Sequence, residues 1–245
     1  MSGKVWLIGA GPGDPELLTL KAVRALAQAE VVLIDDLVNP AVLEHCPAAR
    51  VIPVGKRGGC RSTPQDFIHR LMLRYARQGL SVARLKGGDP CIFGRGGEEA
   101  EWLGARGIEC ELVNGITAGL AAATQCRIPL TLRGVSRGVT LVTAHTQDDS
   151  TLNWRGLAEG GTTLVVYMGV AKLAEIRDGL LDGGMRADTP VAMIENASLP
   201  SQREYRSQLQ DMIEDAQRFA LKSPAILVIG EVAAAVQQAA LVRSA

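Results

Sequence analysis

Apolar and polar residues alternate in blocks along the first 113 positions of the chain. Short apolar runs that end at glycine or at a charged residue are typical of buried parallel strands, and the stretches between them show helical spacing. The apolar runs predict strands at Val5–Gly9, Val31–Asp35, Val51–Val54, Val82–Lys86 and Cys110–Val113. Helices are expected at Pro15–Ala29, Pro64–Gln78 and Gly96–Arg106. Strands that alternate with helices predict a mainly parallel sheet with helices on both faces.

The segment Pro64–Gln78 has the clearest helical pattern of these. Its large apolar side chains fall on one stripe, formed by Phe67, Ile68, Leu71, Met72 and Tyr75. His69 lies off that stripe, so we expect it on a solvated helix face rather than in a catalytic role.

The pattern changes at Asn114. A helix of small residues is expected at Thr117–Gln125, followed by a polar, arginine-bearing stretch. Further strands are predicted at Val139–Ala144, Thr163–Met168, Pro190–Ile194 and Ala225–Gly230, an antiparallel edge strand at Gln202–Ser207, and helices at Ala171–Leu181 and Leu209–Leu221. The predicted fold class is therefore α/β, with an N-terminal domain at residues 1–113, a C-terminal domain at residues 114–245 and a ligand cleft between the two.

Composition narrows the classes of function. The 245 residues contain 26 basic and 26 acidic side chains, so the net charge is zero, and only 4% of the residues are aromatic. A balanced charge and few stacking side chains argue against binding of nucleic acid or of an anionic membrane. Glycine is enriched, with 27 residues, which predicts many tight turns or close backbone approaches.

The five cysteines and three histidines are scattered along the chain. No two cysteines form a C-x-x-C pair, so no metal site is expected, and reduced thiols in a cytoplasm are the simplest interpretation. The apolar run Val5–Ala10 is too short for the core of a signal peptide, and no apolar run approaches the ~18 residues of a membrane span.

A glycine-rich loop, Gly9–Pro15, directly follows the first predicted strand. It is similar to a dinucleotide-binding turn, with Asp35 in the place of the ribose partner, but the sixth position is Asp14 instead of glycine. Its prolines have no N–H group to offer a pyrophosphate. The loop is therefore either a tight turn alone or a close backbone approach to a ligand other than a diphosphate.

A second loop, Arg84–Glu99, carries more information. Arg84 and Lys86 share one face of a strand end, and five glycines then fall within eleven residues around an acid and an arginine. Ligands bind at the carboxyl ends of parallel strands, so this loop predicts a glycine-lined site with charged groups. Within it, Arg95 and Glu98 stand three residues apart and can meet on one helix face, either as a surface ion pair or with Glu98 orienting Arg95 toward a substrate.

Together these segments resemble the tetrapyrrole methylase family over nearly the whole chain, and within it the branch that acts on uroporphyrinogen III. The matching segments, in order, are GAGPGDPELLTLKA, VGKR, LKGGDPCIFGRGGEE, GITAG, IPLT, YMG, ENAS and SPAILVIGEV. The resemblance implies a homodimer that binds S-adenosyl-L-methionine between its two domains and transfers two methyl groups to carbon, giving precorrin-2. The cofactor pocket implied by the family pattern consists of Pro12, Gly87, Gly88, Asp89, Ile92, Thr117, Ala118, Met168 and Ala197.

The resemblance also implies catalytic roles. Asp35 would be the base and Lys56 a proton donor or charge stabiliser, while the alternatives are a capping acid for Asp35 and a solvated surface charge for Lys56. Arg57 and Arg133 are the expected partners of the substrate's carboxylates, because the arginine fork binds a carboxylate with two hydrogen bonds. Further cations that suit this task are Arg61, Arg127 and Arg137.

Three other functions stay open at this point. One is another methylase of the same fold, which acts on a later corrin intermediate or is a diphthine or rRNA relative, although the VGKR and GRGGEE segments favour the uroporphyrinogen branch. Another is a nicotinamide-dependent dehydrogenase, which the departure from G-x-G-x-x-G disfavours. The third is a noncatalytic module that senses an adenosine ligand.

Overall fold

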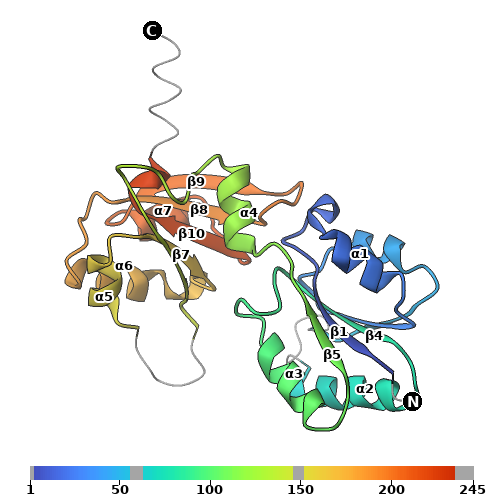
Figure 1. Ribbon diagram of the computed structural model, residues 1–245. Coiled ribbons are helices and arrows are strands. Elements are labelled where there is room, and N and C mark those ends of the chain that lie inside the picture. The colour runs from blue at the N-terminus through green and yellow to red at the C-terminus, as the bar shows by residue number, and fades with distance from the viewer. Residues whose placement is uncertain (1–2, 56–62, 146–151, 235–245) are drawn as a thin grey trace. The chain divides into compact units, whose positions relative to one another are not determined.

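The computed structural model describes residues 3–55, 63–145 and 152–234 (Figure 1). The chain divides into two compact units, one extending through Thr117 and the other beginning at Ala118. Each unit contains one five-stranded sheet.

The sheet of the first unit is entirely parallel, with strand order β3-β2-β4-β1-β5. Its strands are β1 (Val5–Gly9), β2 (Val31–Ile34), β3 (Arg50–Pro53), β4 (Val82–Lys86) and β5 (Cys110–Val113). All five were expected, and every observed end lies within one residue of the predicted one. Because the strands are parallel, their carboxyl ends share one edge of the sheet, and the glycine-rich loops leave from that edge.

Helices cover both faces of this sheet, as predicted (Figure 1). One face packs against α1 (Leu20–Leu26) and the 3-10 segment η2 (Pro40–His45), and the other against α2 (Gln65–Arg77) and α3 (Gly96–Gly104). The helix expected at 15–29 is broken. A 3-10 turn, η1 (Pro15–Leu17), precedes α1, which begins where Thr19 Oγ1 accepts a hydrogen bond from the Ala22 N–H at 3.1 Å.

The buried face of α2 differs from the prediction. His69 is 7% exposed, whereas Phe67, expected on the apolar stripe, is 50% exposed. The helix is rotated so that Ile68, Met72, Tyr75 and Ala76 also face inward. His69 contacts Trp102 of α3, with 4.9 Å between the ring centroids, so the expectation of a solvated histidine was wrong. An aromatic partner on another helix makes a buried position for His69 favourable.

The second unit has a mixed sheet of order β6-β7-β10-β8-β9, in which only β6 and β7 pair in parallel. Its strands are β6 (Val139–Thr143), β7 (Thr163–Tyr167), β8 (Pro190–Glu195), β9 (Arg203–Gln208) and β10 (Ala225–Ile229). The expected antiparallel edge strand is β9. The helices are α4 (Ala118–Gln125), α5 (Trp154–Glu159), α6 (Leu173–Asp182) and α7 (Met212–Arg218), with 3-10 segments η3 (Val170–Lys172) and η4 (Glu231–Ala233).

Helix α5 was not predicted. Trp154, Leu157 and Ala158 of this six-residue segment pack against the core, and they are too few to form a full apolar stripe in the sequence. Its Trp154 lies against α6 at Gly179, where an added Cβ would stand 2.4 Å from the indole ring. Within the part of the chain that the structure describes, no helix is both long and apolar enough to cross a membrane.

Candidate functional site

The loops after β1 and β4 are joined at the carboxyl edge of the first sheet. Gly11 and Gly88 exchange two backbone hydrogen bonds, Gly11 N–H to Gly88 O at 3.2 Å and Gly88 N–H to Gly11 O at 2.7 Å. Both glycines have positive φ, +74° and +68°, a region that other residues occupy at a cost. The turn Gly87–Gly88 is therefore held rigidly beside Pro12, so three residues of the expected cofactor pocket lie together.

Several glycines of the second loop are required by the fold itself. A Cβ on Gly94 or Gly96 would lie 2.7 or 2.6 Å from the carbonyl oxygen of Pro90, and in the loop after β5 one on Gly115 would lie 2.2 Å from Gly88 O. The expectation that the glycine cluster as a whole lines a ligand is thus too broad. In that loop, Gly87 and Gly88 are the glycines whose place at the strand end suits ligand contact.

Asp89 braces these loops from within. Its Oδ1 accepts a hydrogen bond from the Cys91 N–H at 2.8 Å, and its Oδ2 accepts from the Gly115 N–H at 3.0 Å and from Asn114 Nδ2 at 3.3 Å. The side chain is buried. Asp89 therefore acts on the expected pocket by tying the loop after β4 to the loop after β5. Ile92 lies in the same loop and donates its N–H to Asp89 O at 3.3 Å.

Asp35 stands directly after β2, and the neighbouring strand β4 supplies its partner. Arg84 Nη2 donates to both carboxylate oxygens of Asp35, at 2.9 and 2.8 Å. The guanidinium is buried, with 2% of the side chain exposed, whereas 29% of the Asp35 side chain remains exposed. The aspartate thus presents a paired but accessible carboxylate at the carboxyl edge.

Behind this pair lies a row of buried charges that we call the inner charge cluster: Asp35, Arg84, Lys86 and Glu99. Glu99 of α3 is fully buried, and its oxygens lie 3.5 Å from Arg84 Nε and 3.1 to 3.2 Å from Lys86 Nζ. Burial, and then the charge of Arg84, lowers the pKa of Lys86 from its usual value. Two acids and two bases balance, which is the condition under which charges tolerate burial.

Helix α2 closes the cluster with polar side chains. Gln65 Nε2 donates to Glu99 Oε1 at 2.7 Å and lies 3.1 Å from His69 Nε2. Burial lowers the pKa of His69, and the charge of Glu99 opposes that effect only in part. Burial therefore favours the neutral form of His69, which belongs to the packing of the cluster.

The sequence interpretation placed Arg84 and Lys86 on one strand face but did not find Glu99 as their partner. The strand sequence did contain a signal that a buried acid lies nearby. Two cations at alternate positions of a parallel strand that is buried on both faces need a buried counter-charge. Neither the strand nor the helix reveals from its own sequence which of several acids supplies that counter-charge.

Arg95 and Glu98 form the pair that their spacing predicted. Arg95 Nε lies 3.1 Å from both carboxylate oxygens of Glu98, and Nη2 lies 2.6 Å from Oε2. The hydrogen bond from Arg95 lowers the pKa of Glu98, which in turn raises the pKa of Arg95. Arg95 caps the start of α3 with φ of +58°, and 41% of its side chain is exposed. A strained, exposed arginine at a loop-to-helix junction is available to a ligand.

Strained backbone also marks the expected pocket residues of the second unit. Met168 follows β7 with φ of +55° and is 49% exposed, although methionine rarely adopts this conformation and is usually buried. Ala197 lies between Asn196 and Ser198, which have φ of +48° and +64°. Strain of this kind clusters at ligand sites. Thr117 is the last residue of the first unit, and Ala118 is the first residue of the second unit and of α4.

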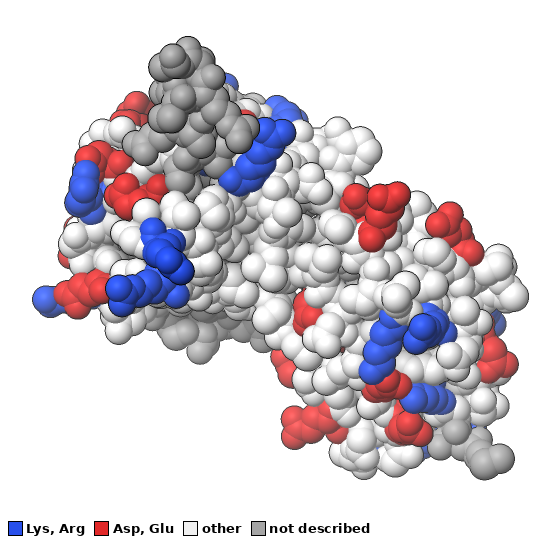
Figure 2. Space-filling view, turned by 45° about the horizontal axis from the view of Figure 1, so that its top comes forward, with Lys and Arg blue, Asp and Glu red and all other residues white. Residues whose placement is uncertain are grey.

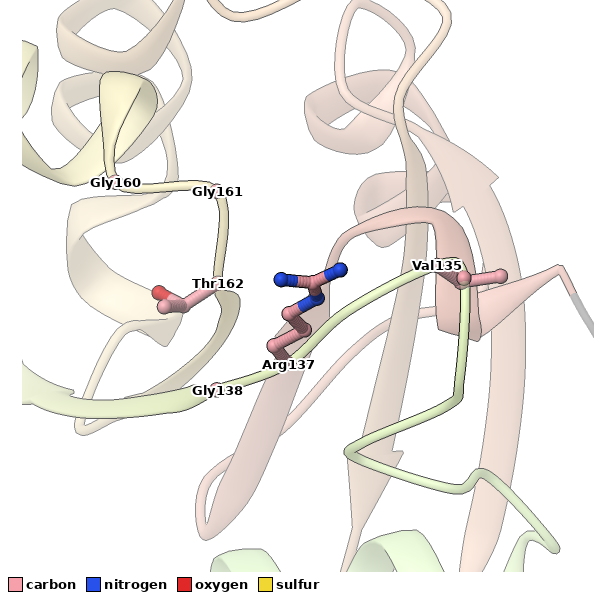
Figure 3. A pocket seen from close by; sticks show the side chains of 7 residues that line it. Val135, Arg137, Gly138, Gly160, Gly161 and Thr162 are labelled. Atoms are coloured by element: carbon pink, nitrogen blue, oxygen red, sulfur yellow. The ribbon is translucent and has the colours of Figure 1, made fainter.

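The structure describes some, but not all, of the cationic residues that were expected to bind the substrate. Arg133 is exposed in the segment between α4 and β6. In the same segment Arg137 projects into a pocket of about 490 Å³, bordered by the turn Gly160–Thr162 (Figure 3). Lys56, Arg57 and Arg61 lie outside the described residues.

Charges on the surface are mixed. Over the face shown in Figure 2, basic and acidic side chains are interspersed, in keeping with the zero net charge of the chain. Among the described residues, no group of histidine, cysteine, aspartate and glutamate side chains is placed to hold a metal ion.

Comparison with known proteins defines the class. The model of the Tetrapyrrole (Corrin/Porphyrin) Methylases matches residues 4–213, so the chain belongs to this family. The uroporphyrinogen-III C-methyltransferase of Pseudomonas aeruginosa is 78% identical over 232 residues, which are 95% of each chain.

Solved structures agree with this class. The uroporphyrin-III C-methyl transferase of Thermus thermophilus, in a complex with S-adenyl homocysteine, is 42% identical with a TM-score of 0.81, covering 94% of this chain and 98% of that one. A cobalt precorrin-4 methyltransferase has a TM-score of 0.83 at 27% identity, covering 94% of this chain and 95% of that one.

Proposed function

We propose that this protein is a methyltransferase that uses S-adenosyl-L-methionine to methylate uroporphyrinogen III at carbon, in two successive transfers, to precorrin-2. The assignment of uroporphyrinogen III as the substrate rests on the 78% identity, over 95% of each chain, to the Pseudomonas aeruginosa uroporphyrinogen-III C-methyltransferase. Methylation of a later corrin intermediate has weaker support, because the cobalt precorrin-4 methyltransferase is only 27% identical despite its similar fold.

The chain fits the cofactor at two places. In the first unit, the turn Gly87–Gly88 offers backbone groups at the carboxyl end of β4, where parallel sheets bind ligands. In the second unit, the strained and exposed Met168 marks the end of β7. When bound, the cofactor supplies an electrophilic methyl group on a sulfonium. The residues Pro12, Ile92, Thr117, Ala118 and Ala197 complete the proposed pocket.

The acid–base roles fall on the same sheet edge. Asp35 keeps an accessible carboxylate, so it accepts the proton that the macrocycle loses when its carbon gains a methyl group. Lys56, close after β3 in the sequence, is proposed as proton donor or charge stabiliser. Asp89 supports this site through the loops that it ties together.

The substrate is a polycarboxylate, and arginines are the proposed partners of its arms. Arg95 is held by Glu98 and remains partly exposed, so it is oriented toward solvent with its fork defined. Arg57 and Arg133 are the further proposed contacts. Arg133 is exposed, and Arg137 is exposed and lines the pocket shown in Figure 3.

We also propose that the protein is a homodimer of the cytoplasm. The family resemblance supports the dimer. The free thiols of Cys46, Cys91, Cys110 and Cys126 suit a reducing compartment. Sedimentation showing a stable monomer of 26 kDa at micromolar concentration contradicts the dimer.

The activity is tested by anaerobic incubation with S-adenosyl-L-methionine and uroporphyrinogen III. The expected result is precorrin-2, seen through its oxidised chromophore and two added methyl groups by mass spectrometry. Binding of the cofactor without turnover supports the sensing module instead. Turnover of a methylated corrin but not of uroporphyrinogen III assigns the chain to a later step.

The cofactor site has its own test. We expect Gly87→Val to weaken binding of S-adenosylhomocysteine in calorimetry, because an added Cβ would stand 3.0 Å from Leu37 Cβ, so the turn has to shift to hold the side chain. Gly104→Ala is the control, since a Cβ there meets nothing within 4 Å. Wild-type affinity in Gly87→Val removes the turn from the site.

A further inference from the structure

Arg84 is a poor choice for a structural side chain unless its charge is used. It is among the largest fully buried side chains of the described residues, and it comes from the centre of β4, between β1 and β2 in the sheet. Burying a guanidinium costs free energy that an apolar residue at the same place avoids. Arg84, Lys86 and Glu99 are buried, and Asp35 is the member of the inner charge cluster whose side chain is accessible, with 29% exposed.

The guanidinium has a single available orientation. Nη1 donates to the backbone carbonyl of Leu85 at 3.0 Å, and Nη2 donates to both oxygens of Asp35. Nε lies 3.5 Å from Glu99 Oε1, as an ion-pair contact rather than a hydrogen bond. Arg84 therefore acts as a fixed brace between a buried acid and an accessible one.

A polycarboxylate substrate makes this brace necessary. Negative charge brought near a carboxylate disfavours its charged form, so a carboxylate that serves as a base beside an anionic substrate needs a cation fixed at its side. A fixed guanidinium opposes that effect. Glu99, whose Oε1 lies 3.5 Å from Arg84 Nε, shares that cation with Asp35 and so weakens its field at the Asp35 carboxylate.

We propose that Arg84 and Glu99 are positioning residues that set the basicity of Asp35 during methyl transfer. Arg84 keeps the Asp35 carboxylate ionised and aimed in the presence of the anionic substrate, and Glu99 limits how strongly it does so. This assignment rests on the proposed function and on Asp35 as the base.

The charged groups around Asp35 come from several elements. Arg84 faces it from β4, and behind Arg84 stand Lys86 of the same strand and Glu99 of α3. Asp36 follows it in the chain, and His69 of α2 reaches the cluster only through Gln65. Of these groups, Arg84 is the one for which the structure gives a hydrogen bond to the Asp35 carboxylate, so its removal has the largest effect.

The test is the pH profile of kcat/KM for uroporphyrinogen III. We expect Arg84→Gln to move the acidic limb upward, because the catalytic base loses the adjacent cation that favours its charged form. Arg84→Lys restores part of that shift. Glu99→Gln, nearly identical in shape, moves the limb in the opposite direction by a smaller amount. Opposite displacements distinguish this role from a structural one, which lowers activity without moving the limb.

Controls separate the possible failures. Glu101→Gln on the exposed side of α3 and Arg77→Lys at the end of α2 change the same groups away from the cluster and leave the limb in place. Each variant is checked by circular dichroism and by its affinity for S-adenosylhomocysteine. Should Arg84→Gln fail to fold, Arg84→Lys and Glu99→Gln still carry the test.

Two results have distinct meanings. An unmoved limb in the folded variants, or limbs that move in the same direction, overturns the positioning roles while the activity stands. Asp35→Asn is expected to abolish the limb. A limb that persists in Asp35→Asn overturns the assignment of Asp35 as the base, and an inactive wild-type protein overturns the proposed function itself.

Discussion

Two adjacent glutamates on α3 have opposite environments. Glu98 is on the surface, with 58% of its side chain exposed, and holds Arg95 through three short contacts. Glu99 is fully buried and faces Arg84 and Lys86 from the neighbouring strand. The helix turns by about 100° per residue, so consecutive positions point in different directions.

The difference separates two uses of an ion pair. At the surface, solvent and salt weaken the pair, so Arg95–Glu98 adds little to folding but leaves an oriented guanidinium for a ligand. In the interior, each charge depends on its partner, because an unpaired one has no water to stabilise it. Glu99 therefore stabilises the fold and, in the proposed role, acts on Asp35 through Arg84. Glu98 only orients Arg95 for the proposed contact with the substrate.

The largest effect is expected from truncating the buried acid. Glu99→Ala leaves Arg84 and Lys86 without their shared partner, so we expect the free energy of unfolding to fall by about 3–5 kcal/mol. Glu98→Ala is expected to leave the free energy of unfolding unchanged within error. Urea denaturation of both variants measures the contrast, and equal losses would show that the two glutamates do not differ in this way.

A smaller effect, on catalysis, is expected at the exposed pair. Arg95→Lys keeps the charge but loses the fork, so turnover of uroporphyrinogen III should fall about tenfold or more while thermal stability and cofactor binding stay near wild type. Glu98→Gln should show the same pattern more mildly. Wild-type rates in both variants make Arg95–Glu98 an ordinary surface pair and leave Arg57 and Arg133 as the proposed substrate contacts.

The buried cluster also predicts a dependence of stability on pH. Burial lowers the pKa of His69 below its ordinary value of 6.5, so the unfolded chain binds this proton more tightly than the folded one. Stability is therefore lost as the pH falls from about 6.5 toward the folded pKa, and His69 contributes no pH dependence above that window. His69→Leu should flatten this part of the profile, measured by urea denaturation at closely spaced pH values. An unchanged slope contradicts the buried, neutral histidine.

The smallest effect concerns salt. Raising the ionic strength from about 0.1 to about 1 M shortens the screening length to about 3 Å, which weakens exposed pairs far more than buried ones. The difference in unfolding free energy between wild type and Glu99→Gln should therefore stay the same at both concentrations. If salt removes that difference, solvent reaches the cluster and Glu99 is not buried in solution.

The sequence by itself determined the first sheet and the residue types at its edge. Five segments located the parallel strands to within one residue, and the three central ones, β1, β2 and β4, are buried along their whole length, so that their boundaries show locally. The spacing of Arg95 and Glu98 predicted their pair, since residues three apart on a helix meet without help from the rest of the chain. The edge strand β9 was also predicted from its own segment, because its side chains alternate along the strand.

Only the tertiary structure decided which partners these residues have. The inner charge cluster joins positions 35, 84, 86 and 99 from three separate elements, and no local pattern states that Glu99 rather than Glu98 turns inward. His69 is buried because Trp102 of another helix packs on it. Gly94 and Gly96 are required by the nearby carbonyl of Pro90, not by a ligand. Periodicity is a property of one segment, whereas burial and charge pairing depend on what the rest of the chain brings against it.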